Sequence, residues 1–221
     1  MRPFDDIYAI ASDRKGGPEA LEALLSCPKS PAELTAIPDD RWLSMMARCL
    51  FQAGFNWKVI DSKWEGFEAA FDGFDVGRVA FFHDEDMDRL LSDKRIVRNG
   101  AKIAAVIDNA RFLSDLSRDH GSAARFFADW PNDDLHSLHQ LIAKQGARLG
   151  AATGQRFLRW MGRDTYILST DVVARLVAEG IVQKQPTSKR DMAAVQQAFN
   201  TWSQQSARGM TQISQILAFS V

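Results

Sequence analysis

The stretch FQAGFNWKVIDSKWEGFEAAFDGFD, residues 51–75, decides the fold class of this chain. Beyond Asn56, large apolar side chains recur every three or four residues, which is the spacing of one face of an α-helix. Asn56 suits a helix N-cap because its side-chain oxygen can accept a hydrogen bond from the first turn. Gly54 interrupts the pattern just before it, so we expect two helices joined by a short glycine turn. The recurring apolar residues are Trp57, Ile60, Trp64, Phe67 and Phe71.

The same helical period continues on both sides of this stretch. Ser30-Pro31-Ala32-Glu33 has the pattern of a capping box with proline at the first helical position. No segment alternates apolar and polar residues as a half-buried strand does, so we expect an all-α fold. Further helices are predicted from Pro38 to near Gly54, from His83 to near Ser92, from Asn99 to about Asp119, near 122–129, 133–145 and 154–162, from Asp171 to about Glu179, from about Lys189 to Ser206, and from Thr211 onward.

Length and composition set the outer limits. At roughly 150 residues per domain, 221 residues allow one compact domain or two subdomains with a shared core. Hydrophobic residues make up 46% and charged residues 25%, as in an ordinary globular protein. No run approaches the roughly 18 apolar residues of a membrane span, and the first residues lack a signal-peptide core. We therefore expect a cytoplasmic protein with no membrane partner.

Charge and motif content exclude several common functions. The net charge is −1, although cations gather in residues 94–102 and 144–163, which leaves room for a local basic face. Cys27 and Cys49 are too few for a disulfide framework or a four-thiolate zinc site. His136 and His139 have no further ligands near them in the sequence, and we expect them on a solvated helix face. The sequence contains no P-loop, GxGxxG, HExxH or GxSxG motif.

Three segments stand out from this helical background. In residues 51–57, a glycine turn lies between large aromatics, either as a simple hinge or as a loop that presses Phe55 into a partner while Trp57 walls a pocket. In residues 149–156, two glycines four apart form either a plain turn or a hairpin whose backbone N–H groups bind a phosphate. In the hairpin we expect Gly154 to have a conformation, or a close backbone approach, that a side chain would obstruct. Asp171 lies at the start of an apolar helix. It is either the cap of that helix or a carboxylate directed toward the ligand that the hairpin would bind.

Two of these segments carry a family resemblance. FQAGFNWK and the following IVRNGAKIAAVIDNARF, residues 96–112, resemble the DNA-3-methyladenine glycosylase I family, whose pattern reads QAGLSW and then IIRHRGKIxAIIxNA. This resemblance covers about residues 41–113. Residues 144–180 are similar to the helix-hairpin-helix glycosylase superfamily, whose hairpin reads LPGVG and whose catalytic aspartate opens the next helix.

The resemblance implies an all-α helix-hairpin-helix DNA glycosylase fold with two helical subdomains and a cleft between them. Residues 1–221 would then form a single glycosylase-like unit that ends in C-terminal helices over residues 187–221. The chain departs from the closer family at Cys49, where that family has a pocket glutamate. It also lacks the cysteines and histidines of the family's structural zinc site, so we expect no metal and no cofactor.

The implied activity is that of a monofunctional DNA glycosylase, which hydrolyses the N-glycosidic bond of alkylated purines such as 3-methyladenine in base excision repair. The substrate would be damaged double-stranded DNA and the protein a monomer. Arg156 lies where bifunctional relatives have a Schiff-base lysine, and a guanidinium that stays protonated cannot attack. The implied roles are Asp171 as the catalytic residue, Trp57, Cys49 and Gln52 in the base pocket, Gly54 and Phe55 as the DNA wedge, and Gly150, Thr153, Gly154, Gln155, Arg156, Arg98 and Lys102 on the DNA backbone.

Two other functions remain open at this stage. One is a non-catalytic helix-hairpin-helix module that binds DNA without turnover, which Cys49 favours. The other is a helical protein–protein scaffold with no role on DNA. Salt-dependent DNA binding separates the scaffold from the other two, and release of bases from alkylated DNA separates the enzyme from the module. Without a glutamate at position 49, we expect selectivity to rest on aromatic stacking and to be loose.

Overall fold

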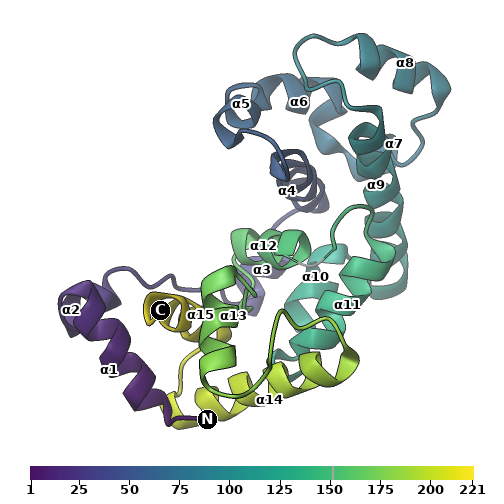
Figure 1. Ribbon diagram of the computed structural model, residues 1–221. Helices are drawn as coiled ribbons and strands as arrows, with labels where there is room; N and C mark the ends of the chain where they lie inside the picture. Colours follow the sequence, from purple (N-terminus) through teal and green to yellow (C-terminus); the bar gives the residue numbers. More distant parts are fainter. Residues whose placement is uncertain (151) are drawn as a thin grey trace. The chain divides into compact units, whose positions relative to one another are not determined.

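The computed structural model describes residues 1–150 and 152–221, and the regular structure within them is entirely helical (Figure 1). The predicted all-α fold is therefore confirmed. The chain forms two compact units, each assembled from separate segments. Unit 1 contains Met1–Lys29, Trp130–Leu138 and Gly162–Val221, and unit 2 contains Ser30–Asp129 and His139–Met161. The cleft expected between two subdomains and the single glycosylase-like unit stay predictions.

Unit 2 contains most of the family resemblance. Its longest helix, α9, has α7 and α10 packed along it, and α4 packs against both α9 and α12 (Figure 1). The helices of this unit are α3 (Pro31–Thr35), α4 (Asp39–Gln52), α5 (Trp57–Ser62), α6 (Trp64–Ala70), η1 (Asp72–Phe74), α7 (Val76–Val79), α8 (Asp84–Ser92), α9 (Gly100–His120), α10 (Ala123–Asp129) and α12 (Ala152–Met161). Helix α11 (Leu135–Gln145) begins in unit 1 and continues in unit 2.

The core of unit 2 is built from aromatic rings. Trp42 of α4 stacks on Phe127 at 4.9 Å between centroids and meets Phe157 edge-on at 5.7 Å. All three side chains are fully buried, and each such side chain contributes about 1.5–3 kcal/mol through its removal from water. Helices α4, α10 and α12 are therefore held together at one point, which fixes where the side chains of α4 and α12 emerge.

The glycine turn and its flanking helices differ in one respect from expectation. Asn56 caps α5 as predicted, since its Oδ1 accepts from the Lys58 N–H at 3.0 Å. The single helix expected to follow is two, however, because Lys63 has φ −103° and ψ 4° and ends α5 before α6 begins. Within α5, Ile60 is buried whereas Trp57 is exposed.

Buried polar contacts connect several elements of unit 1. The Asp164 carboxylate accepts from the N–H groups of Met210 and Thr211 at 3.0 and 2.8 Å and so satisfies two free donors at the start of α15. Arg175 donates to the Ser220 hydroxyl at 2.8 Å and ties α13 to the end of α15. The helices of this unit are α1 (Phe4–Lys15), α2 (Pro18–Glu22), η2 (Asn132–Asp134), α13 (Thr170–Ala178), α14 (Lys189–Ser206) and α15 (Met210–Phe219).

The prediction for the two histidines of α11 is wrong. His139 is buried, and His136 is half-buried with its Nδ1 2.9 Å from Asp134 Oδ1. Packing, rather than solvent, surrounds this helix face. No group of three potential metal ligands occurs in the described parts of the chain, and none of the described helices is long and apolar enough to cross a membrane.

Candidate functional site

A cavity of about 400 Å³ lies within unit 2. Three helices build it, namely α4, α5 after the glycine turn, and the end of α12. Because α4 and α12 are locked by the aromatic core beneath them, the cavity wall is carried by rigid elements. The lining residues are Met45, Arg48, Gln52, Trp57, Asp61 and Trp160.

One wall of the cavity is aromatic. The rings of Trp57 and Trp160 meet edge to face with 5.4 Å between centroids, and the two side chains are 43% and 37% exposed. The Arg156 guanidinium carbon lies 5.1 Å from the Trp57 centroid and 5.7 Å from that of Trp160. Exposed indoles in this arrangement offer flat faces for a planar ligand, and their quadrupoles attract cations by about 0.5–2 kcal/mol.

The cavity also has a polar part. Asp61 Oδ1 accepts from Arg48 Nη2 at 2.7 Å, from Arg48 Nε at 3.1 Å and from Gln52 Nε2 at 2.9 Å. Gln52 itself is buried, and its amide oxygen has no hydrogen-bond partner among the described residues. Gln52 thus lines the cavity and helps to orient Asp61, and its role in a base pocket stays a prediction.

Cys49 does not line this cavity, in contrast to its predicted place in the base pocket. Its side chain is fully buried in α4. Burial raises the pKa of its thiol to about 12, although the charges of Arg156 and Arg48 act in the opposite direction. The residue is a neutral, enclosed thiol behind the wall and offers no group to a ligand.

The glycine turn has the form expected of an exposed loop. Gly54 has φ +75°, a conformation that residues with side chains rarely adopt, and no atom lies within 4 Å of the position a Cβ would take. Phe55 is 42% exposed although it is a large apolar side chain. The predicted wedge residues are therefore accessible at the tip of the loop between α4 and α5.

Lys102 was predicted on the DNA backbone, and the structure gives it another place. Its Nζ is buried and donates to the carbonyl oxygens of Phe51 and Ala53 at 3.1 and 2.7 Å, with the Phe55 ring centroid 4.5 Å away. Burial, together with the nearby charge of Arg148, lowers the pKa of Lys102. Lys102 therefore satisfies free carbonyls at the end of α4 and supports the turn, whereas Arg98 is exposed.

The hairpin between α11 and α12 is tightly packed at Gly154. A Cβ on this residue would lie 2.6 Å from the Leu149 carbonyl oxygen and 2.9 Å from Ile142 Cγ2, so no side chain fits. The expected close backbone approach is confirmed, and Gln155 is buried beside it. The other predicted backbone contacts remain accessible to different extents: Gly150 is exposed, and Thr153 and Arg156 are half-buried in the first turns of α12.

Asp171 lies in the first turn of α13, as expected, and is exposed. Ser169, rather than Asp171, caps this helix, since its side chain accepts from the Val172 N–H at 3.3 Å. The alternative interpretation of Asp171, as the cap of this helix, is therefore wrong. Asp171 belongs to unit 1, whereas the cavity belongs to unit 2, and the predicted catalytic role stays a prediction.

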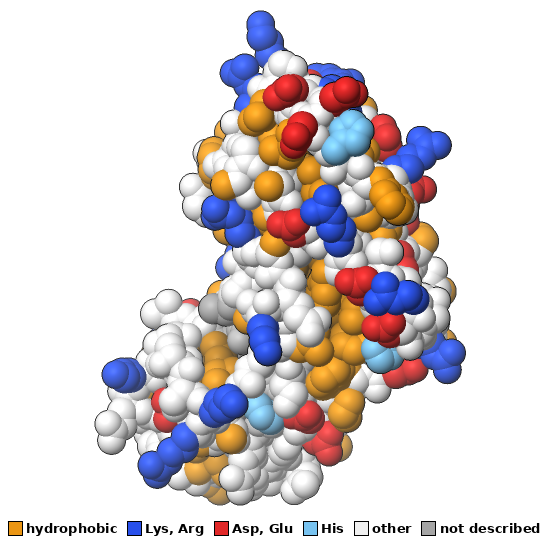
Figure 2. All heavy atoms as spheres, turned by 90° about the vertical axis from the view of Figure 1, so that its right-hand side faces the viewer, with side chains coloured by type: hydrophobic (Ala, Val, Ile, Leu, Met, Phe, Trp, Pro, Cys, Tyr) orange, Lys and Arg blue, Asp and Glu red, His pale blue; other side chains and the backbone are white. Residues whose placement is uncertain are grey.

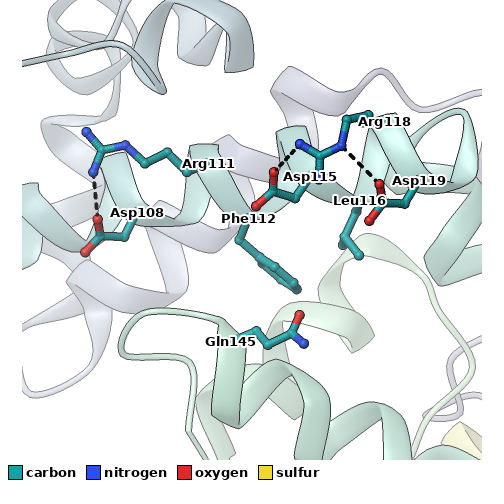
Figure 3. Close-up of a pocket in the computed structure, with 8 residues that line it drawn as sticks. All are labelled: Asp108, Arg111, Phe112, Asp115, Leu116, Arg118, Asp119 and Gln145. Atoms are coloured by element: carbon teal, nitrogen blue, oxygen red, sulfur yellow. Dashed lines mark hydrogen bonds and ion pairs between the residues drawn. The ribbon is translucent and has the colours of Figure 1, made fainter.

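A larger cavity of about 520 Å³ lies along α9, near the end of α11, and offers a weaker site (Figure 3). Its cations are already paired, because Arg111 binds Asp108 at 3.1 Å and Arg118 binds Asp115 and Asp119 at 2.9 and 3.1 Å. On the face drawn in Figure 2, Lys and Arg side chains are likewise scattered among Asp and Glu. Neither feature concentrates charge for a phosphate backbone.

Sequence reasoning missed Met45, Arg48, Asp61 and Trp160 in the cavity wall. A signal for two of them exists in the spacing. Asp61 follows Trp57 by four residues, and Trp160 follows Arg156 by four, so each pair shares a helix face. A charged or aromatic residue one turn away from a proposed pocket residue is thus the pattern that would have found them.

Comparison with solved structures defines the class of this fold. The 8-oxoguanine DNA glycosylase of Methanocaldococcus jannaschii aligns over 96% of this chain and 89% of its own, with a TM-score of 0.56 and 10% identity. The 3-methyladenine DNA glycosylase I of Staphylococcus aureus aligns over 60% of this chain and 81% of its own, with a TM-score of 0.51 and 24% identity. The chain therefore has the helical fold of DNA glycosylases.

Sequence comparison then gives the family. The methyladenine glycosylase pattern matches residues 36–152, which is more than half of the chain, and the chain belongs to this family. A curated relative, DNA-3-methyladenine glycosylase 1 of Escherichia coli (strain K12), is 43% identical over 68 residues. That match covers 31% of this chain and 36% of the relative, or about a third of the relative's length.

Proposed function

We propose that this protein is a monofunctional DNA glycosylase that releases alkylated purines, such as 3-methyladenine, from damaged double-stranded DNA in base excision repair. The observation that carries the proposal is the cavity of unit 2, where two indoles and a carboxylate face the same space within or beside the family-matched segment. The names of the relatives point to the same substrate class. We further propose that the protein works as a cytoplasmic monomer.

The proposed mechanism begins with extrusion of the damaged nucleotide, because the glycosidic bond is inaccessible within the base stack. Phe55, at the tip of an exposed turn, fills the gap in the duplex, and Trp57 stacks on the extruded base. A purine methylated at N3 carries a positive charge that weakens its glycosidic bond and favours an indole face. Little acid catalysis is then required.

The Asp171 carboxylate stabilises the oxocarbenium-like sugar or orients the attacking water in this proposal. Arg156 supports the assignment as a simple hydrolase, since its guanidinium is charged and already packed over Trp57. No residue on α12 offers a neutral amine for a Schiff base, so the abasic strand is left uncut. The exposed Arg98 and the start of α12 hold the DNA backbone.

The direct test is incubation of the protein with methylated DNA, followed by chromatography of the released bases. Release of 3-methyladenine without strand cleavage supports the proposal. The rival function, a non-catalytic DNA-binding module, is favoured by the neutral Cys49 where the family has glutamate. Salt-dependent DNA binding with no released base would establish that rival, and the absence of DNA binding would exclude both.

A further inference from the structure

The Asp61 carboxylate uses only one of its two oxygens. All three hydrogen bonds from Arg48 and Gln52 end on Oδ1, and Oδ2 accepts none from the described residues. The side chain is 43% exposed and forms part of the cavity wall. An ionised carboxylate has about four acceptor positions, so Asp61 retains acceptor capacity for a ligand.

The donors around Asp61 also fix its orientation. Arg48 and Gln52 both come from α4, one turn apart, and converge on the same atom. Since neither the guanidinium nor the Nε2 group can accept a hydrogen bond, the atom they share must be an acceptor. The remaining oxygen is therefore held in place, as a preorganised acceptor beside the indole wall requires.

We propose that Asp61 accepts a hydrogen bond from the amino group at C6 of the purine and makes this site select adenine-type bases over 6-oxo purines. The inference rests on the proposed glycosylase function and deepens it. A carboxylate that accepts from a cationic purine makes a charge-assisted hydrogen bond, about twice as strong as a neutral one. A 6-oxo purine presents an acceptor to the same atom and leaves both groups unpaired.

This role replaces the one that the family resemblance assigns to position 49. Cys49 is enclosed and neutral, so the acceptor comes from α5 instead of α4. Stacking on Trp57 and Trp160 alone hardly separates one purine from another. With Asp61 in the wall, the site has a hydrogen-bond acceptor that distinguishes 6-amino from 6-oxo purines. The selectivity between purines is therefore expected to be sharp, whereas stacking alone predicted loose selectivity.

The test is the variant Asp61→Asn, because the hydrogen bonds from Arg48 and Gln52 determine how the new amide is oriented. Arg48 and Gln52 require an acceptor at the Oδ1 position, so the amide nitrogen takes the Oδ2 position and turns the open acceptor into a donor. Release of 3-methyladenine and 3-methylguanine is measured from the same methylated DNA, since both bases carry the charge that labilises the bond. We expect the ratio of the two rates to fall by about 10- to 100-fold, the cost of one polar group left unpaired where the bound base covers it.

Two further variants complete the design. Asp61→Ala removes the acceptor without adding a donor, so release of 3-methyladenine falls while that of 3-methylguanine does not rise. The matched control is Asp129→Asn, an exposed aspartate of unit 2 that pairs with Arg125 at 3.3 Å outside the cavity. For Asp129→Asn, the ratio of 3-methyladenine release to 3-methylguanine release should equal that of the wild type. Thermal melting of each variant shows that the fold is retained.

The outcomes separate the inference from the proposed function. If the wild type releases both bases and Asp61→Asn leaves the ratio unchanged, the inference is overturned and the glycosylase function stands. If the wild type releases no base, calorimetric binding of the two free bases supplies a readout without turnover. Tighter binding of 3-methyladenine, reversed in Asp61→Asn, then supports the acceptor role although the enzyme function fails, and equal binding of both bases by the wild type overturns it.

Discussion

Two carboxylates of unit 2 are held by similar donors but differ in how many of their oxygens accept hydrogen bonds. Glu68 and Asp61 each receive an arginine and a second polar side chain from α4. At Glu68, Arg41 binds both oxygens at 2.9 Å, and Ser44 and Trp64 donate to Oε1 at 2.7 and 3.1 Å. Both oxygens of Glu68 are thus in use, whereas Asp61 has a free one.

This difference separates a structural carboxylate from a binding one. Burial raises the pKa of Glu68, but the hydrogen bonds of Arg41, Ser44 and Trp64 outweigh it and place the pKa below its ordinary value. The ionised form is therefore stabilised by the fold itself. Asp61 is oriented by donors on one side only and faces a cavity on the other. A saturated acceptor contributes to stability, while an oriented but unsaturated one is free to contribute to recognition.

The largest expected effect concerns a third carboxylate, that of Asp171, which is exposed and accepts no hydrogen bond from the described residues. If an open carboxylate marks function, Asp171→Asn should lower base release about a hundredfold, with DNA binding changed by no more than a few fold. Single-turnover release from methylated DNA measures the first effect, and salt titration of DNA binding the second. Undiminished release by the variant would remove Asp171 from the mechanism.

The next effect is on stability and contrasts Glu68 with Asp61. In Glu68→Gln an amide N–H₂ must face Arg41 or Ser44, so the free energy of unfolding should fall by about 2 kcal/mol and Tm by about 4–8 °C. Asp61→Asn can still accept at Oδ1 and should change stability by less than about 1 kcal/mol. Urea and thermal unfolding of both variants measure the difference. Equal losses for the two would refute the distinction between a saturated and an open carboxylate.

The pH dependence of the stability difference between the wild type and Glu68→Gln supplies a control. The pKa of Glu68 is lowered in the folded state, so its contribution to stability is present above the unfolded pKa of about 4.3 and is lost as pH falls through the folded value. The stability gap between the wild type and Glu68→Gln should therefore be full at pH 6 and 7 and narrow below about pH 4. A gap that grew on acidification would contradict the assignment.

A smaller effect is expected from the aromatic wall. Trp57→Ala removes an exposed stacking surface and should reduce release of every methylated purine about tenfold, since stacking contributes about 1–3 kcal/mol per base. Its stability should change little, because the ring is 43% exposed. Trp64 is the matched control: it stacks on Phe67 and Phe74 and donates to Glu68, so Trp64→Ala should lower Tm. Full activity of Trp57→Ala would show that the base binds elsewhere.

The sequence predicted those features that depend on neighbouring residues. The caps predicted at Ser30 and Asn56 both form as hydrogen bonds to the first turn of their helices. Each is decided within four residues, because one side-chain oxygen meets one free N–H nearby. The close approach at Gly154 was likewise predicted from its place in the hairpin.

Features that depend on packing between helices could not be predicted in the same way. Lys102 looks like a surface cation in the sequence, but the carbonyls it binds belong to Phe51 and Ala53, some fifty residues earlier. The pairing of Arg48 with Asp61 similarly needs α4 and α5 to meet at the glycine turn. Hydrophobic periodicity predicts which face of each helix is buried but not which helix packs against that face. These contacts are therefore seen only in the folded structure.

The smallest expected effect concerns Cys49, which lies between Arg48 and Gln52 in sequence yet behind the wall that they form. With a pKa of about 12, roughly one thiol in ten thousand is ionised at pH 8, and only the thiolate reacts readily. Iodoacetamide should therefore label the exposed Cys27 in the native protein, label both cysteines in urea, and leave base release unchanged. Mass spectrometry of each peptide measures the labelling. Rapid native modification of Cys49 with loss of activity would place its thiol in the cavity and restore position 49, rather than Asp61, as the residue that meets the base.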